Sequence, residues 1–91
     1  MKAEELFKQL GFKKYSDDNI TLSYSYDSRR EKTKYMVVFY FDDRSYQVYS
    51  VSYSIRLFSR EKMYYPIYEP YRISKDMHKA IITQLDELGW W

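Results

Sequence analysis

The sequence predicts an α+β domain in which an N-terminal and a C-terminal helix cover one face of a three- or four-stranded antiparallel sheet. Amphipathic helical stripes lie near both ends of the chain, and the region between them alternates apolar and polar residues as strands do. Both glycines follow directly after a helical stripe, where helices commonly end. The 91 residues contain no linker or internal repeat, so we expect a single compact domain over 1–91.

The first helix is predicted over residues 2–10. Its apolar stripe has the spacing of one helical face and consists of Leu6, Phe7 and Leu10. Gly11 should end this helix in a left-handed turn. Phe12 then stands where a Schellman turn would fold it back onto Phe7.

The last helix is predicted over residues 75–88, with Ser74 as its N-cap. Its stripe is longer and comprises Met77, Ile81, Ile82, Leu85 and Leu88. Gly89 should end the helix in the same way as Gly11 ends the first, with Trp90 folding back onto Leu85.

Three strands are predicted between the helices. Residues 20–26 alternate apolar and polar side chains, whereas residues 35–41 are apolar on both faces, as in a central strand. The third strand begins near Tyr46, and its apolar register follows Tyr49, Val51, Tyr53, Ile55 and Leu57.

A polar turn is predicted at residues 59–62, and a short fourth strand can follow it at 63–65. This strand should be short because Pro66 and Pro70 end any regular ladder. The predicted core lies between the helices and one sheet face, and comprises Leu6, Leu10, Leu22, Val37, Phe39, Phe41, Val51, Ile81, Leu85 and Leu88. The other sheet face should then present tyrosines to water.

The composition argues against catalysis and against bound cofactors. There is no cysteine, and His78 is the only histidine, with no nucleophile placed beside it by the sequence. The pairs Asp17-Asp18 and Asp42-Asp43 are typical of turns and lack the further ligands of a metal site. We therefore expect no enzyme, no cofactor, no metal and no small-molecule substrate.

The charge and hydropathy of the chain bear on its location. A net charge of +2 is too small for long-range attraction to nucleic acid or membrane, and the longest apolar run, residues 36–41, is too short to span a bilayer. The N-terminus lacks the apolar stretch of a signal peptide. We expect a cytoplasmic protein with no membrane partner.

Basic residues gather in two loops beside tyrosines: Arg29, Arg30, Lys32 and Lys34 in the first loop, and Arg56 and Arg60 in the second. Stacking rings next to cationic loops favour single-stranded nucleic acid as one hypothesis. Solvated loops and an acidic protein partner are the alternatives, because Glu31 and Glu61 interrupt the basic runs.

The segment 63–72 holds four tyrosines and two prolines, and these side chains have no role in a predicted helix or long strand. It either covers the open sheet face or binds a protein, which would be a second copy of the chain or a different partner. Tyrosine and arginine are enriched at protein interfaces. The predicted partner-binding residues are Tyr64, Tyr65, Tyr68, Tyr71, Arg72 and Trp91.

The chain also resembles a known class of proteins. The run Ala3-Glu4-Glu5-Leu6-Phe7, then Leu10-Gly11-Phe12, and the closing Glu87-Leu88-Gly89-Trp90 are similar to those of small uncharacterised proteins encoded by phages and prophages of Gram-positive bacteria. The resemblance implies a compact α+β domain in a bacterial host cell and supplies no catalytic residues. It also implies a binding role, since many small phage proteins bind and inhibit host machinery, including defence systems.

Overall fold

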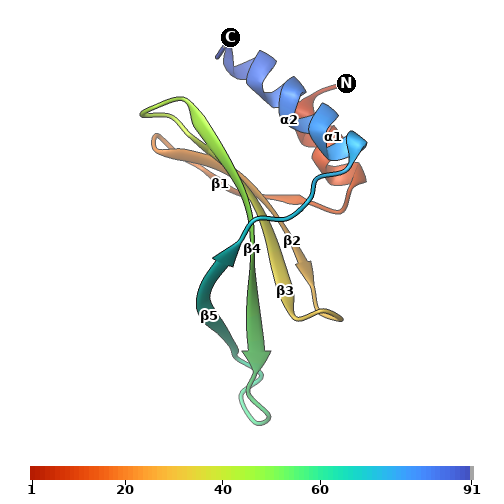
Figure 1. Cartoon of the computed structure of the whole chain (residues 1–91), viewed down its shortest axis with the longest axis vertical. Helices are drawn as coiled ribbons and strands as arrows, with labels where there is room; N and C mark the ends of the chain where they lie inside the picture. The colour runs from red at the N-terminus through yellow and green to blue at the C-terminus, as the bar shows by residue number, and fades with distance from the viewer. Residues whose placement is uncertain (91) are drawn as a thin grey trace.

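The computed structural model describes residues 1–90 and has two helices and five strands (Figure 1). In chain order these are α1 (Ala3–Gln9), β1 (Lys13–Asp17), β2 (Thr21–Ser28), β3 (Thr33–Tyr40), β4 (Ser45–Ile55), β5 (Lys62–Glu69) and α2 (Lys75–Leu88). The strands form one antiparallel sheet in the order β1-β2-β3-β4-β5, so each strand pairs with its neighbour in sequence. The predicted α+β class is confirmed, with more strands than the three or four expected.

The end of α1 has the predicted Schellman geometry. Gly11 has a φ of 90°, and the Phe12 backbone N–H donates to the Phe7 carbonyl over 2.9 Å. The two phenyl rings meet edge to face with centroids 6.3 Å apart. The helix ends here because glycine adopts the left-handed conformation without the steric cost that a side chain brings.

Both ends of α2 are also as predicted. The Ser74 hydroxyl accepts a hydrogen bond of 3.1 Å from the Met77 N–H, which caps the first turn. At the other end Gly89 has a φ of 70°, and the Trp90 N–H donates to the Leu85 carbonyl over 3.2 Å.

Strand β1 has no counterpart among the predicted strands. It is a short edge strand, and a register shift between Lys14 and Ser16 interrupts its pairing with β2. Its sequence shows no alternation of apolar and polar residues, because most of its side chains are exposed. The predicted first strand corresponds to β2, although Ile20 lies outside it and is 71% exposed.

Strand β5 continues through Pro66, so the prediction that this proline ends the ladder is wrong. The pairing of β4 with β5 shifts between Val51 and Tyr53, and three residues, 65–67, lie opposite Ser52 alone. A bulge in an edge strand tolerates proline, since no partner needs its missing N–H there.

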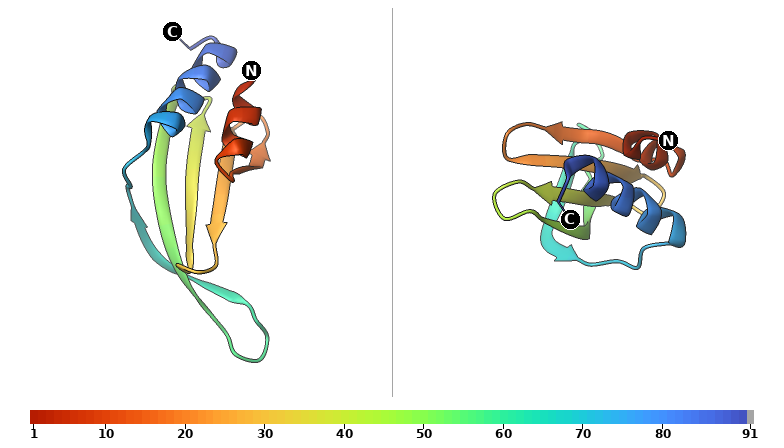
Figure 2. Two further views of the ribbon diagram at one scale, coloured as in Figure 1. Left: turned by 90° about the vertical axis from the view of Figure 1, so that its right-hand side faces the viewer. Right: turned by 90° about the horizontal axis from the view of Figure 1, so that it is seen from above.

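One apolar core joins both helices to one face of the sheet, called here the helix face (Figure 2). Its buried members are Ala3, Phe7, Phe12, Leu22, Tyr24, Val37, Phe39, Met77, Ala80 and Ile81. Phe7 lies at its centre, and its ring stacks on that of Tyr24 with centroids 4.1 Å apart. Five further predicted core residues pack against this cluster while partly buried: Leu6, Leu10, Phe41, Leu85 and Leu88.

The predicted placement of Val51 in this core is wrong. Val37 lies opposite Val48 in the ladder, so Val48 is the β4 residue on the helix face. Val51 lies opposite Lys34 and is buried on the other face of the sheet, called here the far face. Side chains of a strand alternate between faces, so an odd offset of three positions reverses the side on which a residue lies.

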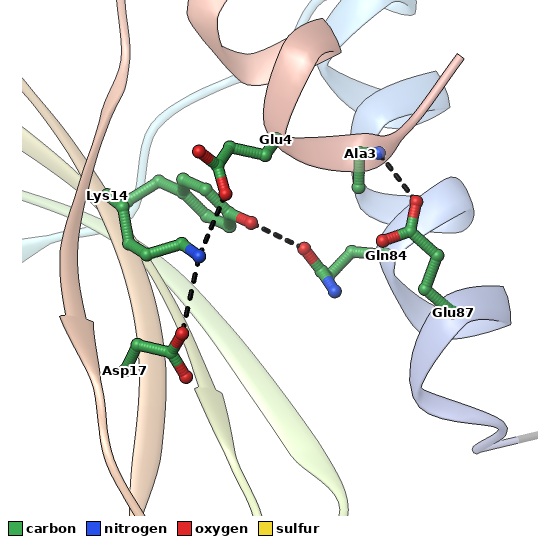
Figure 3. A network of polar contacts seen from close by, with 7 residues as sticks. Ala3, Glu4, Lys14, Asp17, Gln84 and Glu87 are labelled. Atoms are coloured by element: carbon green, nitrogen blue, oxygen red, sulfur yellow. Dashed lines mark hydrogen bonds and ion pairs between the residues drawn. The ribbon is translucent and has the colours of Figure 1, made fainter.

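Polar contacts hold the two helices and the sheet together (Figure 3). The Tyr24 hydroxyl donates to the Gln84 side chain over 2.6 Å in the buried interface, and the Ala3 backbone N–H donates to Glu87 over 2.6 Å. Lys14 on β1 pairs with Glu4 on α1 over 2.8 Å. Burial raises the pKa of Tyr24 to about 12, so its hydroxyl remains a donor at neutral pH.

The helices cover only one end of the sheet. In Figure 1 they lie with both chain ends at the top, and the hairpin formed by β4 and β5 extends to the bottom, beyond the turn that joins β2 to β3. The molecule is elongated, with extents of 46 × 26 × 21 Å. The helices therefore do not cover the part of the hairpin near its turn.

Candidate functional site

The distal part of the β4–β5 hairpin carries most of the exposed apolar surface. Of the thirteen large apolar residues that are exposed in the described part of the chain, eight lie between Ile55 and Tyr68. These eight form what we call the hairpin surface: Ile55, Leu57, Phe58, Met63, Tyr64, Tyr65, Ile67 and Tyr68. A concentration of this kind is typical of an interaction site, whereas single exposed apolar residues are common on any protein.

Strand β5 presents this surface on both sides. Tyr64 pairs with Tyr53 and Tyr68 with Val51, so both tyrosines lie on the far face. On the other side Tyr65 and Ile67 line a hollow of about 140 Å³ together with Ser50, Ser52 and Glu69. The outer edge of β5 is free along the described chain, because the sheet ends at this strand.

The β4–β5 hairpin is fastened to β2 through Asp27. Its carboxylate accepts a hydrogen bond of 2.5 Å from the hydroxyl of Tyr53, a side chain that is only 2% exposed, and also pairs with Lys62. Burial acts to raise the pKa of Asp27, but the hydrogen bonds from Lys62 and Tyr53 and the charge of Lys62 outweigh burial and lower the pKa from its ordinary value. Asp27 is therefore ionised at neutral pH and holds both partners.

On the far face, tyrosine rings provide the cover that the helices provide on the helix face. Tyr15, Tyr49, Tyr64 and Tyr68 line a hollow of about 250 Å³ around Lys34. The Lys34 ammonium lies 3.8 Å from the centroid of the Tyr15 ring and 5.9 Å from that of Tyr64, within the range of cation–π attraction. In this hollow Lys34, one of the basic residues predicted for nucleic acid, meets Tyr64 and Tyr68, two of the tyrosines predicted to bind a partner.

Tyr71 lies apart from the other three tyrosines of its segment. It is half-buried on the helix side, where its ring meets that of Tyr35 edge to face with centroids 4.9 Å apart. Its hydroxyl is buried with no partner in the structure, and burial raises its pKa. Tyr71 and Arg72 line a hollow of about 310 Å³ beside the start of α2. Trp91, the last of the predicted partner-binding residues, lies outside the described residues.

Four of the six basic residues predicted for nucleic acid lie together. Arg29 and Lys32 from the β2–β3 turn and Arg56 and Arg60 from the β4–β5 turn line a hollow of about 490 Å³, called here the basic hollow. Lys34 lies in the tyrosine hollow instead, and Arg30 lines neither. The structure therefore places the two basic loops side by side, which the sequence could not establish.

Sequence reasoning missed the apolar residues at the end of the hairpin. Leu57 was placed in the register of the third strand, but β4 ends at Ile55, and both Leu57 and Phe58 lie in the turn. The sequence signal that could have identified them is their position directly before the polar run Ser59-Arg60-Glu61. An apolar pair in a turn has no neighbouring strand to cover it.

The residues that the sequence offered for catalysis or metal binding, His78 and the two aspartate pairs, are exposed. His78 is exposed on α2, and no group of three potential metal ligands occurs among residues 1–90. Asp18 accepts hydrogen bonds of 2.8 Å from the backbone N–H groups of Ile20 and Thr21, as turn aspartates do. None of the helices described here is long and apolar enough to cross a membrane.

Comparison with known proteins supplies no relative. No family model, no curated protein and no solved structure matches the chain. The resemblance to phage and prophage proteins therefore stays a prediction, and the function must be argued from the surfaces described above.

Proposed function

We propose that this chain is a non-enzymatic protein-binding module that acts through β5 and the adjoining hairpin surface. The observation that carries the proposal is the concentration of eight of the thirteen exposed large apolar residues in residues 55–68. Its partner is a second copy of the chain or a host protein, and the resemblance to phage proteins favours an accessory or inhibitory role in a bacterial cell.

The composition of β5 supports a protein as the partner. Tyr64, Tyr65 and Tyr68 are rigid aromatic side chains that are 46%, 53% and 64% exposed, and aromatic residues of this kind carry much of the binding energy at interfaces. Ile67 adds an aliphatic side chain that is 63% exposed. The free edge of β5 also leaves backbone groups for a partner strand, although the bulge at Pro66 limits the length of such pairing.

Light scattering over a concentration series is the first test, because it separates the two kinds of partner. A dimer that dissociates in the double variant Tyr65→Ser with Ile67→Ser identifies the second copy as the partner. Ile20→Ser is the matched control, since Ile20 is 71% exposed and lies outside the hairpin surface. The control should leave the dimer intact.

A monomer at all concentrations directs the test to a host protein. A photoreactive phenylalanine analogue at position 65 should then form a discrete cross-linked species in a bacterial lysate, and the same analogue at position 20 should not. A monomer with no cross-link specific to position 65 contradicts the proposal.

Nucleic acid remains the second candidate, and the observation that favours it is the gathering of four basic residues in the basic hollow. The two candidates differ in their response to salt. Binding through Tyr65 and Ile67 should persist at moderate salt, whereas phosphate contacts weaken steeply as salt rises. Single-stranded binding at physiological salt that Arg29→Ala with Arg30→Ala abolishes would establish this alternative.

A further inference from the structure

The turn between β4 and β5 holds two adjacent apolar side chains that nothing in the described chain covers. Leu57 is 91% exposed and Phe58 is 101% exposed. We call this pair the hairpin tip. Because these two large side chains are not buried, they do not contribute hydrophobic free energy to folding. Adjacent exposed apolar side chains of this size are typical of a contact with another surface.

The hairpin tip lies where a flat surface could reach it. It is at the end of the long axis opposite the helices and both chain ends, and it projects past the β2–β3 turn (Figures 1 and 2). In Figure 1 and in the left view of Figure 2 no other element extends as far as the β4–β5 turn at this end of the molecule. The tip can therefore meet an extended surface without a collision with the body of the domain.

The basic hollow adjoins the tip, because Leu57 belongs to both. Leu57 and Ile55 line it together with four cations, Arg29, Lys32, Arg56 and Arg60, and no aspartate or glutamate contributes to its lining. None of the four forms an ion pair among the described residues. Glu61 is the one acid in the turn sequence 56–61, and it does not line the hollow.

We propose that the hairpin tip and the basic hollow together form a docking site for an anionic phospholipid bilayer. Leu57 and Phe58 enter the boundary between head groups and acyl chains, and the adjoining cations contact lipid phosphates. Reversible attachment needs two signals of this kind, because a small apolar anchor or a polybasic patch alone binds weakly. This site shares Leu57 and Phe58 with the hairpin surface, but it does not use Tyr65 and Ile67, the residues that the test of protein binding replaces.

The kind of apolar residue favours a bilayer over nucleic acid. Leu57 and Phe58 lie in the same turn as Arg56 and Arg60, and a membrane offers an apolar layer next to phosphates, which suits both kinds of side chain. Phe58 can stack on a base, but the aliphatic Leu57, which lines the basic hollow beside the cations, cannot. The proposal replaces the expectation of no membrane partner, which rested on the net charge of +2, because the cations are concentrated at one end of the molecule.

Vesicle flotation tests the proposal. The full chain should float with vesicles of phosphatidylcholine mixed with phosphatidylserine, should not float with phosphatidylcholine alone, and should detach as salt rises. The double variant Leu57→Ser with Phe58→Ser should lower the partition constant about tenfold or more, since two apolar side chains no longer enter the lipid. Arg56→Gln with Arg60→Gln should lower it by roughly 25-fold, at about fivefold for each cation.

Ile20→Ser controls for the loss of any exposed apolar side chain and should float as the unchanged protein does. Thermal unfolding of each variant checks the fold, which substitutions of uncovered side chains should leave intact. Failure to float with either vesicle, or flotation that the Leu57 and Phe58 substitutions leave unchanged, overturns the proposal. One further outcome also overturns the proposal: the protein binds a single-stranded oligonucleotide more tightly than it binds the vesicles, Arg56→Gln with Arg60→Gln loses this binding, and Leu57→Ser with Phe58→Ser keeps it. That result assigns the basic hollow to nucleic acid.

Discussion

Replacing Asp27 by alanine should loosen the attachment of the hairpin to the rest of the sheet. The substitution leaves the Tyr53 hydroxyl, buried and bonded over 2.5 Å, without an acceptor. An unsatisfied buried hydroxyl costs about 1–3 kcal/mol. The lost ion pair with Lys62 is partly exposed, so it adds at most about 1 kcal/mol. The free energy of unfolding should therefore fall by about 2–3 kcal/mol in Asp27→Ala.

Asp27→Asn separates the two contributions. The amide keeps an oxygen acceptor for Tyr53 and removes only the charge that faces Lys62, so it should cost about 1 kcal/mol. Urea denaturation measures both free energies directly. In thermal unfolding, a change of 1 kcal/mol moves the midpoint by about 4–8 °C for a domain of this size, so the alanine variant should melt roughly 10–20 °C lower. Asp42→Ala, a change in an exposed turn, is the matched control and should have little effect.

Equal losses of unfolding free energy in Asp27→Ala and Asp27→Asn would refute this reasoning, because they would show that removing the acceptor of the buried Tyr53 hydroxyl does not lower stability. Acid provides a second check. The pKa of Asp27 in the folded state is lower than in the unfolded chain, so its contribution is fully present above the unfolded pKa and is lost as the pH falls through the lowered pKa. The stability difference between the unchanged protein and Asp27→Asn should therefore disappear in acid.

Three further predictions concern the core, a helix end and alkaline stability. Tyr24→Phe should lower the free energy of unfolding by about 1–3 kcal/mol in urea denaturation, because the buried Gln84 oxygen loses its donor; an unchanged urea midpoint would contradict this. Gly89→Ala should cost about 1 kcal/mol by the same measurement from backbone strain alone, since φ is 70° and no atom lies within 4 Å of an added Cβ; a neutral result would mean that the turn relaxes. Burial raises the pKa of Tyr24 and of Tyr53 from 10 to about 12. The contribution of these two residues to the free energy of unfolding should therefore be fully present below pH 10 and be lost as the pH rises towards 12. A urea midpoint that stays constant between pH 10 and about 12 would contradict this prediction.

The helices and their ends could be predicted because the signals that specify them are local. A stripe at helical spacing, a serine before it and a glycine after it sufficed for α2, whose predicted and observed bounds agree. Strand β1 escaped prediction because an exposed edge strand needs no apolar alternation. The wrong side assigned to Val51 has a different cause. Strand β4 carries apolar residues on both faces, so its sequence alone does not determine which set faces the helices.

The candidate site was predicted only in part, because surface properties depend on which segments meet in space. The tyrosines at 64, 65 and 68 were singled out by composition, and they are exposed on β5. The meeting of the two basic loops depends on the antiparallel register, in which the β2–β3 turn and the β4–β5 turn lie at the same end of the sheet. No spacing in the sequence encodes that proximity.

Tyrosines lie on both faces of the sheet, and this explains how so small a domain can leave the end of the β4–β5 hairpin uncovered. The helices reach only one end of one face, yet Met36, Val38 and Val51 on the far face are each no more than 7% exposed. Tyrosine can bury its ring and keep its hydroxyl in water, so the rings of Tyr49 and Tyr68, which meet edge to face at 5.3 Å, shield this face without a third layer. Beyond that cover, Leu57 and Phe58 are buried by nothing within the described chain, and this is why we assign the end of the hairpin to contacts with other surfaces.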